Sequence, residues 1–238
     1  MKNIILLFLI LLAFQSASAQ TVIFDNLLQS HVTKEGVVDY KNFDGKNLKK
    51  YLNYLEKTPP NNSWSTNQQK AFWINTYNAY TIYLILHAKH TKELKNSILD
   101  INRKGKTAWQ IPFVKVGDKT YTLDFIEHQI LRKKFFDPRI HVAVNCASIS
   151  CPKLANKAFT EENIETELTK LMNNFINDTS KNKISANKIE ISAIFDWFQE
   201  DFTKKGSIID FLNTYTNNKI QPNAEISYLN YNWALNSN

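Results

Sequence analysis

The chain has 238 residues and a formal net charge of +7 at pH 7, from 29 Lys and Arg against 22 Asp and Glu. This length suits one domain with a full hydrophobic core. The basic residues are dispersed along the chain, which predicts a solvated surface rather than a nucleic-acid interface. No two of the five glycines lie close enough to form a phosphate-binding loop, and the G-x-S-x-G and H-E-x-x-H motifs are absent, so the enzyme classes that use these motifs are excluded.

The N-terminal segment predicts export. Lys2 precedes an unbroken apolar run at 4–14, and small residues follow at 17–19, where a signal peptidase would cleave. The run is shorter than the roughly 20 residues that span a bilayer as a helix. We therefore expect a signal peptide at residues 1–19 and one globular domain at 20–238, in a periplasmic or secreted protein with no later transmembrane segment.

The first half of the expected domain is predicted to be mainly helical. Two amphipathic helices and a short extended segment between them are predicted at 22–32, 43–57 and 36–40. A long helix over residues 65–88 carries apolar side chains on opposite faces, which predicts that it is buried. Asn75 and Asn78 lie among these apolar residues. Because buried amides need hydrogen-bond partners, we expect the two side chains to brace neighbouring loops or, alternatively, to line a pocket.

A hairpin and another helix are predicted next. Residues 111–121 have the pattern of a hairpin, and Thr122 is the expected N-cap of a helix at 123–135. Glu127 falls within the apolar stripe of that helix, where an unpaired carboxylate is costly. It is therefore a candidate functional acid, unless it forms a structural ion pair with Arg139.

The second half of the chain mixes short strands with helices. Residues 140–145 alternate in polarity, which predicts a strand with His141 and Asn145 on one face. Helices are also predicted at 161–176, 195–202 and 206–215. The remaining strands and an aromatic tail are predicted at 183–185, 188–191, 226–229 and 231–233. The expected fold class is α+β: a single, mainly helical domain whose central buried helix packs on a small mixed or antiparallel sheet.

Several motifs in this order resemble one known family. AFWINTYNAYTI at 71–82, TLDFIEHQILR at 122–132 and RIHVAVNCASISCP at 139–152 are similar to the domain of unknown function 547 family, as are ISAIFDWFQEDF at 191–202 and SYLNYNWALN at 227–236. The resemblance covers a core of about residues 69–202 and implies no agreed activity. The recurring polar residues of the family match Asn75, Asn78, Glu127, His128, Arg139, His141, Cys146 and Cys151. The chain departs from the family pattern at Lys153, where a second proline is frequent, and at Asn232, where aspartate is frequent.

The cysteines, together with the acid and histidines before them, suggest a thiol enzyme. A nucleophilic cysteine needs a base and a group that orients the base, so Cys146 is the candidate nucleophile, His128 or His141 the base, and Glu127 the orienting acid. An extended strand would place His141 roughly 13–16 Å from Cys146, which favours His128 unless the chain bends back. Alternatively, Cys151 returns towards His141. Our leading hypothesis is a cysteine-dependent hydrolase or transferase acting on amide or acyl bonds. The residues expected to support the site are Asn75, Asn78, Arg139, Asn145 and Cys151.

Two other hypotheses stay open. Exported proteins meet oxidising conditions, so Cys146 and Cys151 alternatively form a disulfide worth about 2 kcal/mol that fixes a non-catalytic module for a peptide, glycan or envelope polymer. In that module Trp73, Trp109 and Trp233 line the binding surface, or else belong to the core. The two histidines and two cysteines supply zinc ligands in the third and least favoured hypothesis, because C-x4-C is looser than the usual zinc spacings. We expect neither a metal nor a cofactor.

Overall fold

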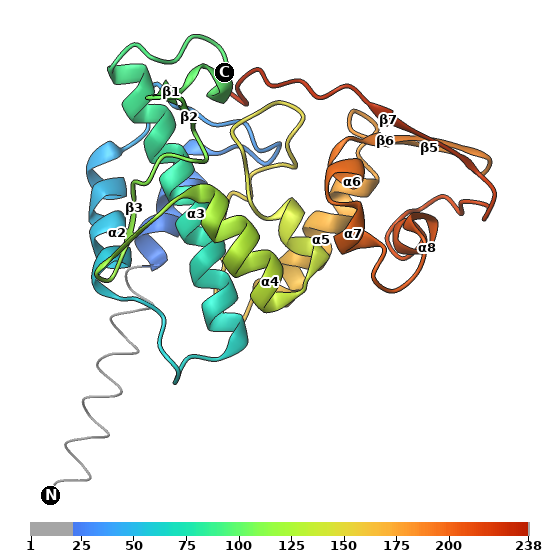
Figure 1. Cartoon of the computed structure of the whole chain (residues 1–238), viewed down its shortest axis with the longest axis horizontal. Helices are drawn as coiled ribbons and strands as arrows, with labels where there is room; N and C mark the ends of the chain where they lie inside the picture. The colour runs from blue at the N-terminus through green and yellow to red at the C-terminus, as the bar shows by residue number, and fades with distance from the viewer. Residues whose placement is uncertain (1–20, 238) are drawn as a thin grey trace, which may run out of the picture.

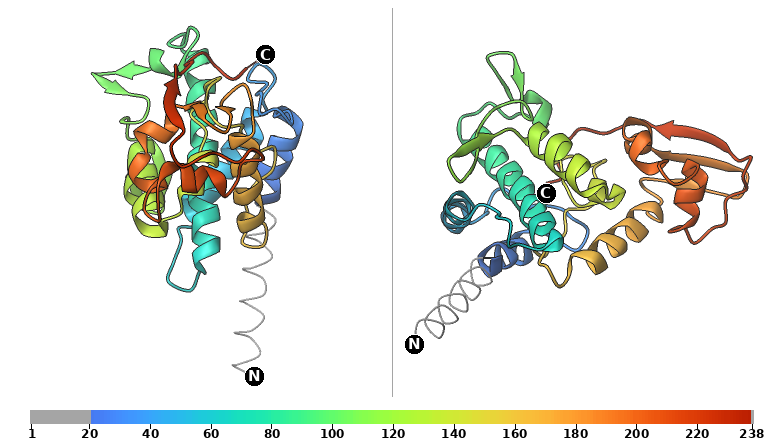
Figure 2. Two further views of the ribbon diagram at one scale, coloured as in Figure 1. Left: turned by 90° about the vertical axis from the view of Figure 1, so that its right-hand side faces the viewer. Right: turned by 60° about the horizontal axis from the view of Figure 1, so that its bottom comes forward.

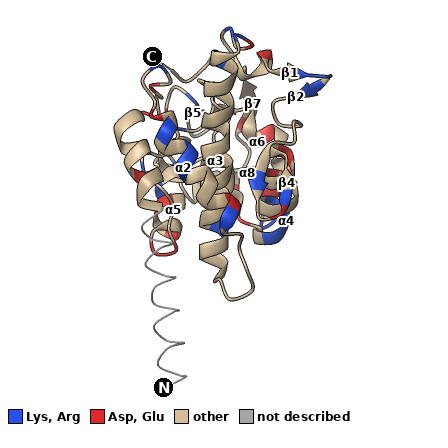
Figure 3. Ribbon diagram, turned by 90° about the vertical axis from the view of Figure 1, so that its left-hand side faces the viewer, with Lys and Arg blue, Asp and Glu red and all other residues tan. Residues whose placement is uncertain are grey.

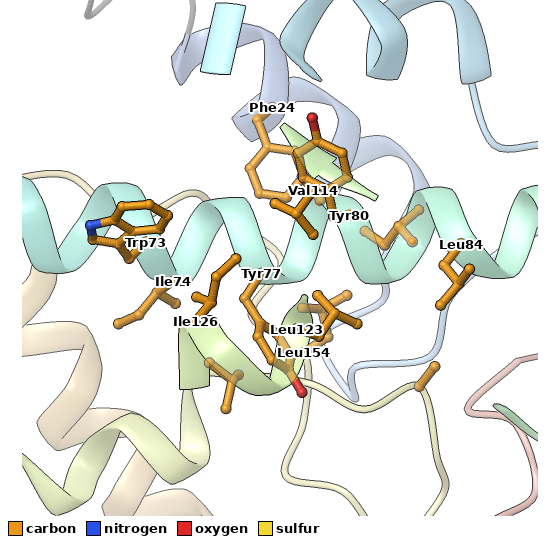
Figure 4. Packing of buried hydrophobic residues seen from close by; sticks show 14 of the residues in the cluster. Phe24, Trp73, Ile74, Tyr77, Tyr80, Leu84, Val114, Leu123, Ile126 and Leu154 are labelled. Atoms are coloured by element: carbon orange, nitrogen blue, oxygen red, sulfur yellow. The ribbon is translucent and has the colours of Figure 1, made fainter. Parts of the chain in front are cut away.

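A long helix, α3 (Thr66–His90), forms the centre of the structure, and the other helices and loops surround it (Figure 1). The structure is a computed structural model that describes residues 21–237, so the predicted signal peptide lies outside the described residues. A capping box starts α3: the Ser65 hydroxyl accepts from the Gln68 N–H, and the Gln68 side chain accepts from the Ser65 N–H. Tyr77 of this helix lies beside Leu123 and Leu154 of later segments (Figure 4), and the Trp73 ring contacts the ring of Tyr121, which confirms the predicted buried helix.

The N-terminal helices lie against α3. A helix at 21–31 is followed by α2 (Gly45–Lys57), and the rings of Phe24 and Tyr51 stack between them with centroids 4.7 Å apart. The segment between the two helices contains Val38, which forms β-bridges to two other parts of the chain. Both predicted helices and the extended segment are therefore confirmed.

Short hairpins follow α3. The 3-10 helix η1 (Ile98–Asp100) is followed by the pair β1 (Asn102–Arg103) and β2 (Lys106–Thr107), and then by the predicted hairpin of β3 (Val114–Val116) and β4 (Lys119–Tyr121). The hairpin contacts the central helix through the Tyr80 hydroxyl, which donates to the Lys115 carbonyl oxygen at 3.1 Å.

The helix that carries Glu127 has an unexpected form. Thr122 caps its start as predicted, because its hydroxyl accepts from the Phe125 N–H at 3.0 Å. The first part, η2 (Phe125–Leu131), is a π-helix that continues into α4 (Arg132–Phe135), and the Arg132 N–H donates to the Glu127 carbonyl oxygen. A π-helical turn is rare and is frequent at functional sites. Period-based prediction assumes 3.6 residues per turn and gave no sign of it.

The predicted strand at 140–145 is wrong. Pro138 and the following residues form the 3-10 helix η3 (Pro138–Val142), in which the Asp137 carboxylate accepts from the Arg139 N–H at 3.1 Å. Proline at the first helical position and aspartate at the cap both favour a helical turn. The alternating polarity wrongly indicated a strand, because His141 is not on an exposed face but is buried like the apolar residues on either side of it.

The C-terminal unit contains the only three-stranded sheet among residues 21–237. The helix α5 (Ile164–Ile176) leads into β5 (Lys183–Ile184) and β6 (Lys188–Ser192), which pair antiparallel, and β6 pairs parallel with β7 (Glu225–Leu229). Three short helices lie between the last two strands: α6 (Ile194–Trp197), α7 (Gln199–Phe202) and α8 (Ile208–Asn213). This unit projects to one side of the helical body (Figure 2). The α+β class and the mixed sheet are as predicted.

After β7 the chain returns across the body. Isolated bridges join Ala234 to Ser97 and Leu235 to Ser148, so the last residues hold together segments that are far apart in the sequence. Figure 3 shows Lys and Arg interspersed with Asp and Glu over the face that it presents. Within residues 21–237, no helix combines the length and apolarity that a membrane crossing requires.

Candidate functional site

Two asparagines of α3 fix the backbone around the candidate site. The Asn78 amide donates to the Ala143 carbonyl oxygen at 2.8 Å, and its oxygen accepts from the Asn145 N–H at 2.9 Å. One turn earlier, Asn75 makes the same pair of bonds with the backbone of Phe159, at 2.7 and 3.0 Å. Both side chains are buried, so the predicted bracing role is confirmed.

A tight loop over residues 145–151 carries both cysteines. The Asn145 side chain donates to the Pro152 carbonyl oxygen at 2.9 Å and accepts from the Ala147 N–H at 2.9 Å, which closes the loop on itself. Ala147 has a φ of 58°, the left-handed region that residues other than glycine rarely adopt, and it is fully buried. Such strain persists only where the surroundings fix it, and it concentrates at functional sites.

The two cysteines are free thiols, so the disulfide of the alternative hypothesis is not formed in this structure. The Cys146 Sγ lies 3.1 Å from the Ser148 hydroxyl and 3.1 Å from the Tyr231 hydroxyl. The Cys151 Sγ accepts from the Cys146 N–H at 3.1 Å. Cys146 is partly exposed, whereas Cys151 is 5 % exposed.

These contacts give the two thiols different acidities. Burial disfavours the Cys146 thiolate, but hydrogen bonds with Cys151, Ser148 and Tyr231 outweigh burial, and the pKa of Cys146 lies below its ordinary value. Burial and the neighbouring Cys146 raise the pKa of Cys151 well above the ordinary value. Burial also raises the pKa of Tyr231, so its hydroxyl keeps its proton and remains a donor.

Glu127 is a buried acid near this sulfur. Its side chain is on η2, and burial raises its pKa, although the charge of His128 and a hydrogen bond from Tyr77 oppose the rise. The Tyr77 hydroxyl in turn accepts from the Trp109 Nε1–H at 3.1 Å. The charge of Glu127 raises the pKa of Cys146, so the two groups lie within electrostatic range of each other.

The ion pair between Glu127 and Arg139, which was the alternative to a functional acid, is not formed among the described residues. Arg139 donates to Asp137 at 2.8 Å and also pairs with Glu165, and Lys70 joins the same two carboxylates. This network connects α3, η3 and α5. Arg139 is therefore paired within the network and not with the Glu127 carboxyl. Arg139 therefore supports the fold around η3 rather than the sulfur directly.

The structure gives both candidate histidines other partners. His141 Nε2 lies 2.8 Å from an Asp201 oxygen, and its ring stacks on Phe198 with centroids 4.0 Å apart. His128 Nδ1 lies 3.1 Å from a guanidinium nitrogen of Arg132. Among residues 21–237, neither histidine forms a hydrogen bond with a cysteine, so the cysteine–histidine pairing in our hypothesis is not assembled here.

Aromatic side chains lie next to the sulfur. Trp233 contacts Trp109 at 5.8 Å, Trp197 at 5.8 Å and Tyr231 at 4.5 Å between ring centroids. Trp197 is 48 % exposed, so this aromatic cluster (Trp109, Trp197, Tyr231 and Trp233) opens to solvent. Trp73, by contrast, belongs to the core.

Sequence reasoning missed Tyr231, Ser148 and Tyr77 as site residues. The one available signal for Tyr231 was the closing motif SYLNYNWALN, which resembles the family pattern although it lies far from the cysteines in sequence. The zinc hypothesis is not supported, because no group of three or more His, Cys, Asp or Glu side chains within residues 21–237 is arranged to hold a metal ion.

Comparison with known proteins adds one match. Residues 61–176 match the model of a family described as "Protein of unknown function, DUF547". This range includes Asn78, Glu127 and both cysteines, and it ends before the aromatic tail. No curated protein and no solved structure matches the chain.

Proposed function

We propose that this chain, which belongs to the DUF547 family, is a thiol-dependent enzyme in which Cys146 attacks an acyl or amide carbonyl carbon. One observation carries the proposal: the partly exposed Cys146 sulfur lies 3.1 Å from each of two hydroxyl groups, those of Ser148 and Tyr231. A hydroxyl that donates to the sulfur at this distance stabilises a thiolate, which is the nucleophilic form of cysteine. The strained backbone at Ala147 is a second feature that is typical of active sites.

The proposed reaction has two steps. The Cys146 thiolate adds to the carbonyl carbon, and the resulting tetrahedral species expels an amine or alcohol to leave a thioester on the enzyme. Water, or a second nucleophile in a transfer reaction, then attacks the thioester carbon and releases Cys146 as the thiolate.

Glu127 is the group that we assign to proton transfer. The leaving group needs a proton, and burial shifts the Glu127 carboxyl towards its protonated form, which is the form that can donate one. The hydrogen bond with Tyr77 orients this carboxyl inside the protein. His128 and His141 are engaged elsewhere, so the proposal does not assign them the role of base that the sequence had suggested.

The aromatic cluster supports a substrate with an uncharged, apolar or planar group beside its carbonyl. Trp197 and Trp233 are nearly parallel, with an interplanar angle of 15°, and Tyr231 joins them to the Cys146 sulfur. Faces of this kind bind peptide side chains or sugar rings. A peptide or a glycan-linked peptide of the cell envelope fits these contacts and the proposed amide chemistry.

Acylation by p-nitrophenyl acetate, a simple acyl donor, tests the function. We expect a burst of p-nitrophenolate and an acetyl group on Cys146 in the mass spectrum of the reduced protein, and neither in C146A. Y231F should slow acetylation because the thiolate loses a donor. Y228F is the matched control, since Tyr228 is an exposed tyrosine of β7 and is not among the hydrogen-bond partners of Cys146 within residues 21–237.

Two results would contradict the proposal. One is the absence of an acetyl group on Cys146 in a protein whose Cys146 is still alkylated by iodoacetamide. The other is a Cys146–Cys151 disulfide that cannot be reduced without unfolding the chain, because a permanent disulfide would favour the non-catalytic module.

We also propose that the protein is exported after removal of residues 1–19. The support is the basic and apolar pattern of the N-terminus followed by small residues. Expression of the full chain in a bacterial host and N-terminal sequencing of the exported product should give a start at Gln20 or Thr21. Recovery of the uncleaved chain in the cytoplasmic fraction alone would contradict export.

A further inference from the structure

We propose that Cys146 and Cys151 form a dithiol–disulfide couple that reduces an external disulfide, with Cys146 as the attacking thiol and Cys151 as the resolving thiol. This activity uses the same sulfur as the proposed acyl chemistry but does not depend on it. The three tryptophans of the aromatic cluster and Glu127 are not needed for the exchange. The carrying observations are the proximity of the two cysteines and their unequal exposure.

The geometry places one cysteine beside the backbone of the other. The Cys146 N–H donates to the Cys151 Sγ at 3.1 Å, and the two thiols also interact with each other. In this structure the Cys146 sulfur is turned towards the hydroxyls of Ser148 and Tyr231. Because the Cys151 sulfur lies next to the Cys146 nitrogen, rotation about the Cα–Cβ bond of Cys146 brings the sulfurs together.

Hydrogen bonds hold the loop in a conformation in which this side-chain rotation alone can bring the two sulfurs together. Asn145 fastens the loop to Pro152 and Ala147, and Asn78 fastens Asn145 to α3. The ends of the six-residue ring are therefore already close, and little chain entropy remains to be lost when the disulfide forms.

The unequal exposure of the two thiols assigns the attacking role to Cys146 and the resolving role to Cys151. Cys146 is partly exposed and meets an incoming disulfide first, whereas Cys151 is only 5 % exposed and is shielded from it. Their acidities agree with these roles, since the pKa of Cys146 is lowered and that of Cys151 is raised. Lys181 donates to the Ile149 carbonyl oxygen within the loop, and its positive charge favours the thiolate form of both cysteines.

The exchange balances without a further co-reactant. The Cys146 thiolate attacks one sulfur of the external disulfide, forms a mixed disulfide and expels the first thiolate. The Cys151 thiol passes its proton to the first thiolate, attacks the Cys146 sulfur and expels the second thiolate, which takes a proton from water. The protein dithiol is oxidised by two electrons to the Cys146–Cys151 disulfide, and the external disulfide is reduced to two thiols.

Oxidised glutathione is the probe for this proposal. The reduced full-length chain is mixed with it, quenched with acid and digested with trypsin, which releases both cysteines in one peptide after Arg139 and up to Lys153. In the wild type we expect this peptide to lose two hydrogens without lasting glutathione attachment. C151S should accumulate glutathione on Cys146, because the resolving thiol is missing. C146S should stay unmodified, because Cys151 is buried.

Three outcomes would overturn the proposal: persistent glutathione on the wild type, absence of reaction in C151S, or modification of C146S as fast as C151S. Circular dichroism establishes that each variant is folded. If C146S does not fold, the wild type treated with a limiting amount of iodoacetamide gives the same information. The first alkylated site must be Cys146, and first alkylation at Cys151 overturns the order of attack.

Different experimental outcomes contradict the disulfide exchange and the acyl chemistry. Acetylation of Cys146 by p-nitrophenyl acetate is measured on the reduced protein and again after glutathione oxidation. Acetylation only in the reduced form supports both proposals. Exchange without any acetylation removes the acyl function alone, and acetylation that persists after the oxidant treatment removes the dithiol couple alone.

Discussion

Replacing Asn78 with alanine should loosen the cysteine loop and slow the reaction of Cys146. The side chain satisfies the Ala143 carbonyl at 2.8 Å and the Asn145 N–H at 2.9 Å, and all three residues are buried. Each buried backbone group left without a partner costs about 1–3 kcal/mol, so N78A should lower the free energy of unfolding by about 2–6 kcal/mol.

The effect on Cys146 follows from its hydroxyl partners. If the loop shifts enough to remove one hydrogen bond from the thiolate, worth about 1 kcal/mol, the thiolate fraction near neutral pH falls roughly fivefold. The rate of iodoacetamide alkylation of Cys146 as a function of pH measures this change, and urea unfolding followed by circular dichroism measures the stability.

Asn75 provides a matched control on the same helix. N75A removes an equivalent pair of backbone hydrogen bonds, at 2.7 and 3.0 Å, but these hold Phe159 and not the cysteine loop. We expect a similar loss of stability and an unchanged alkylation profile. Equal effects of N75A and N78A on the profile, or no effect of N78A, would refute the idea that Asn78 positions the sulfur.

Three other changes test separate parts of the fold. Burial lowers the pKa of His141, so the unfolded chain binds the proton of this histidine more tightly than the folded chain. The free energy of unfolding should therefore fall as the pH drops below about 6.5. H141Q should show a smaller difference in urea midpoint between about pH 7.5 and about pH 5.5 than the wild type. G36A should destabilise by several kcal/mol because its new methyl group would lie 2.8 Å from backbone atoms at a φ of 81°, whereas G105A, at a φ of 78° with nothing within 4 Å, should cost about 1 kcal/mol. K70M removes one of the cations that lower the pKa of Asp137 to about 2, so that pKa should rise and acid unfolding should begin at a higher pH than in the wild type.

Helix patterns were the most predictable part of the fold. The run of apolar residues on opposite faces of α3 correctly indicated a buried helix, because no surface helix can hide two apolar faces. The amides within it had to find partners, and that requirement alone predicted the bracing by Asn75 and Asn78. Capping by Thr122 also followed from local rules.

The site was less predictable because its contacts are long-range. Alternation around His141 indicated a strand, but Pro138 and the Asp137 cap start a 3-10 helix instead. The estimate of distance between His141 and Cys146 rested on that strand. His141 is held by Asp201, which lies 60 positions later in the chain, and no local pattern encodes such a contact.

The tail explains why sequence reasoning selected a candidate nucleophile but not its surroundings. Asn236 accepts from the Tyr40 hydroxyl at 3.1 Å and donates to the Asn145 side chain at 3.3 Å, so it joins the N-terminal segment to the cysteine loop. Tyr231, in the same tail, supplies the hydroxyl beside Cys146. The family match ends at residue 176 and therefore covers the thiol and the acid without this tail. On the proposed function, the chemistry then resides in the matched region, while the tail supplies the aromatic surface that selects what reaches the sulfur.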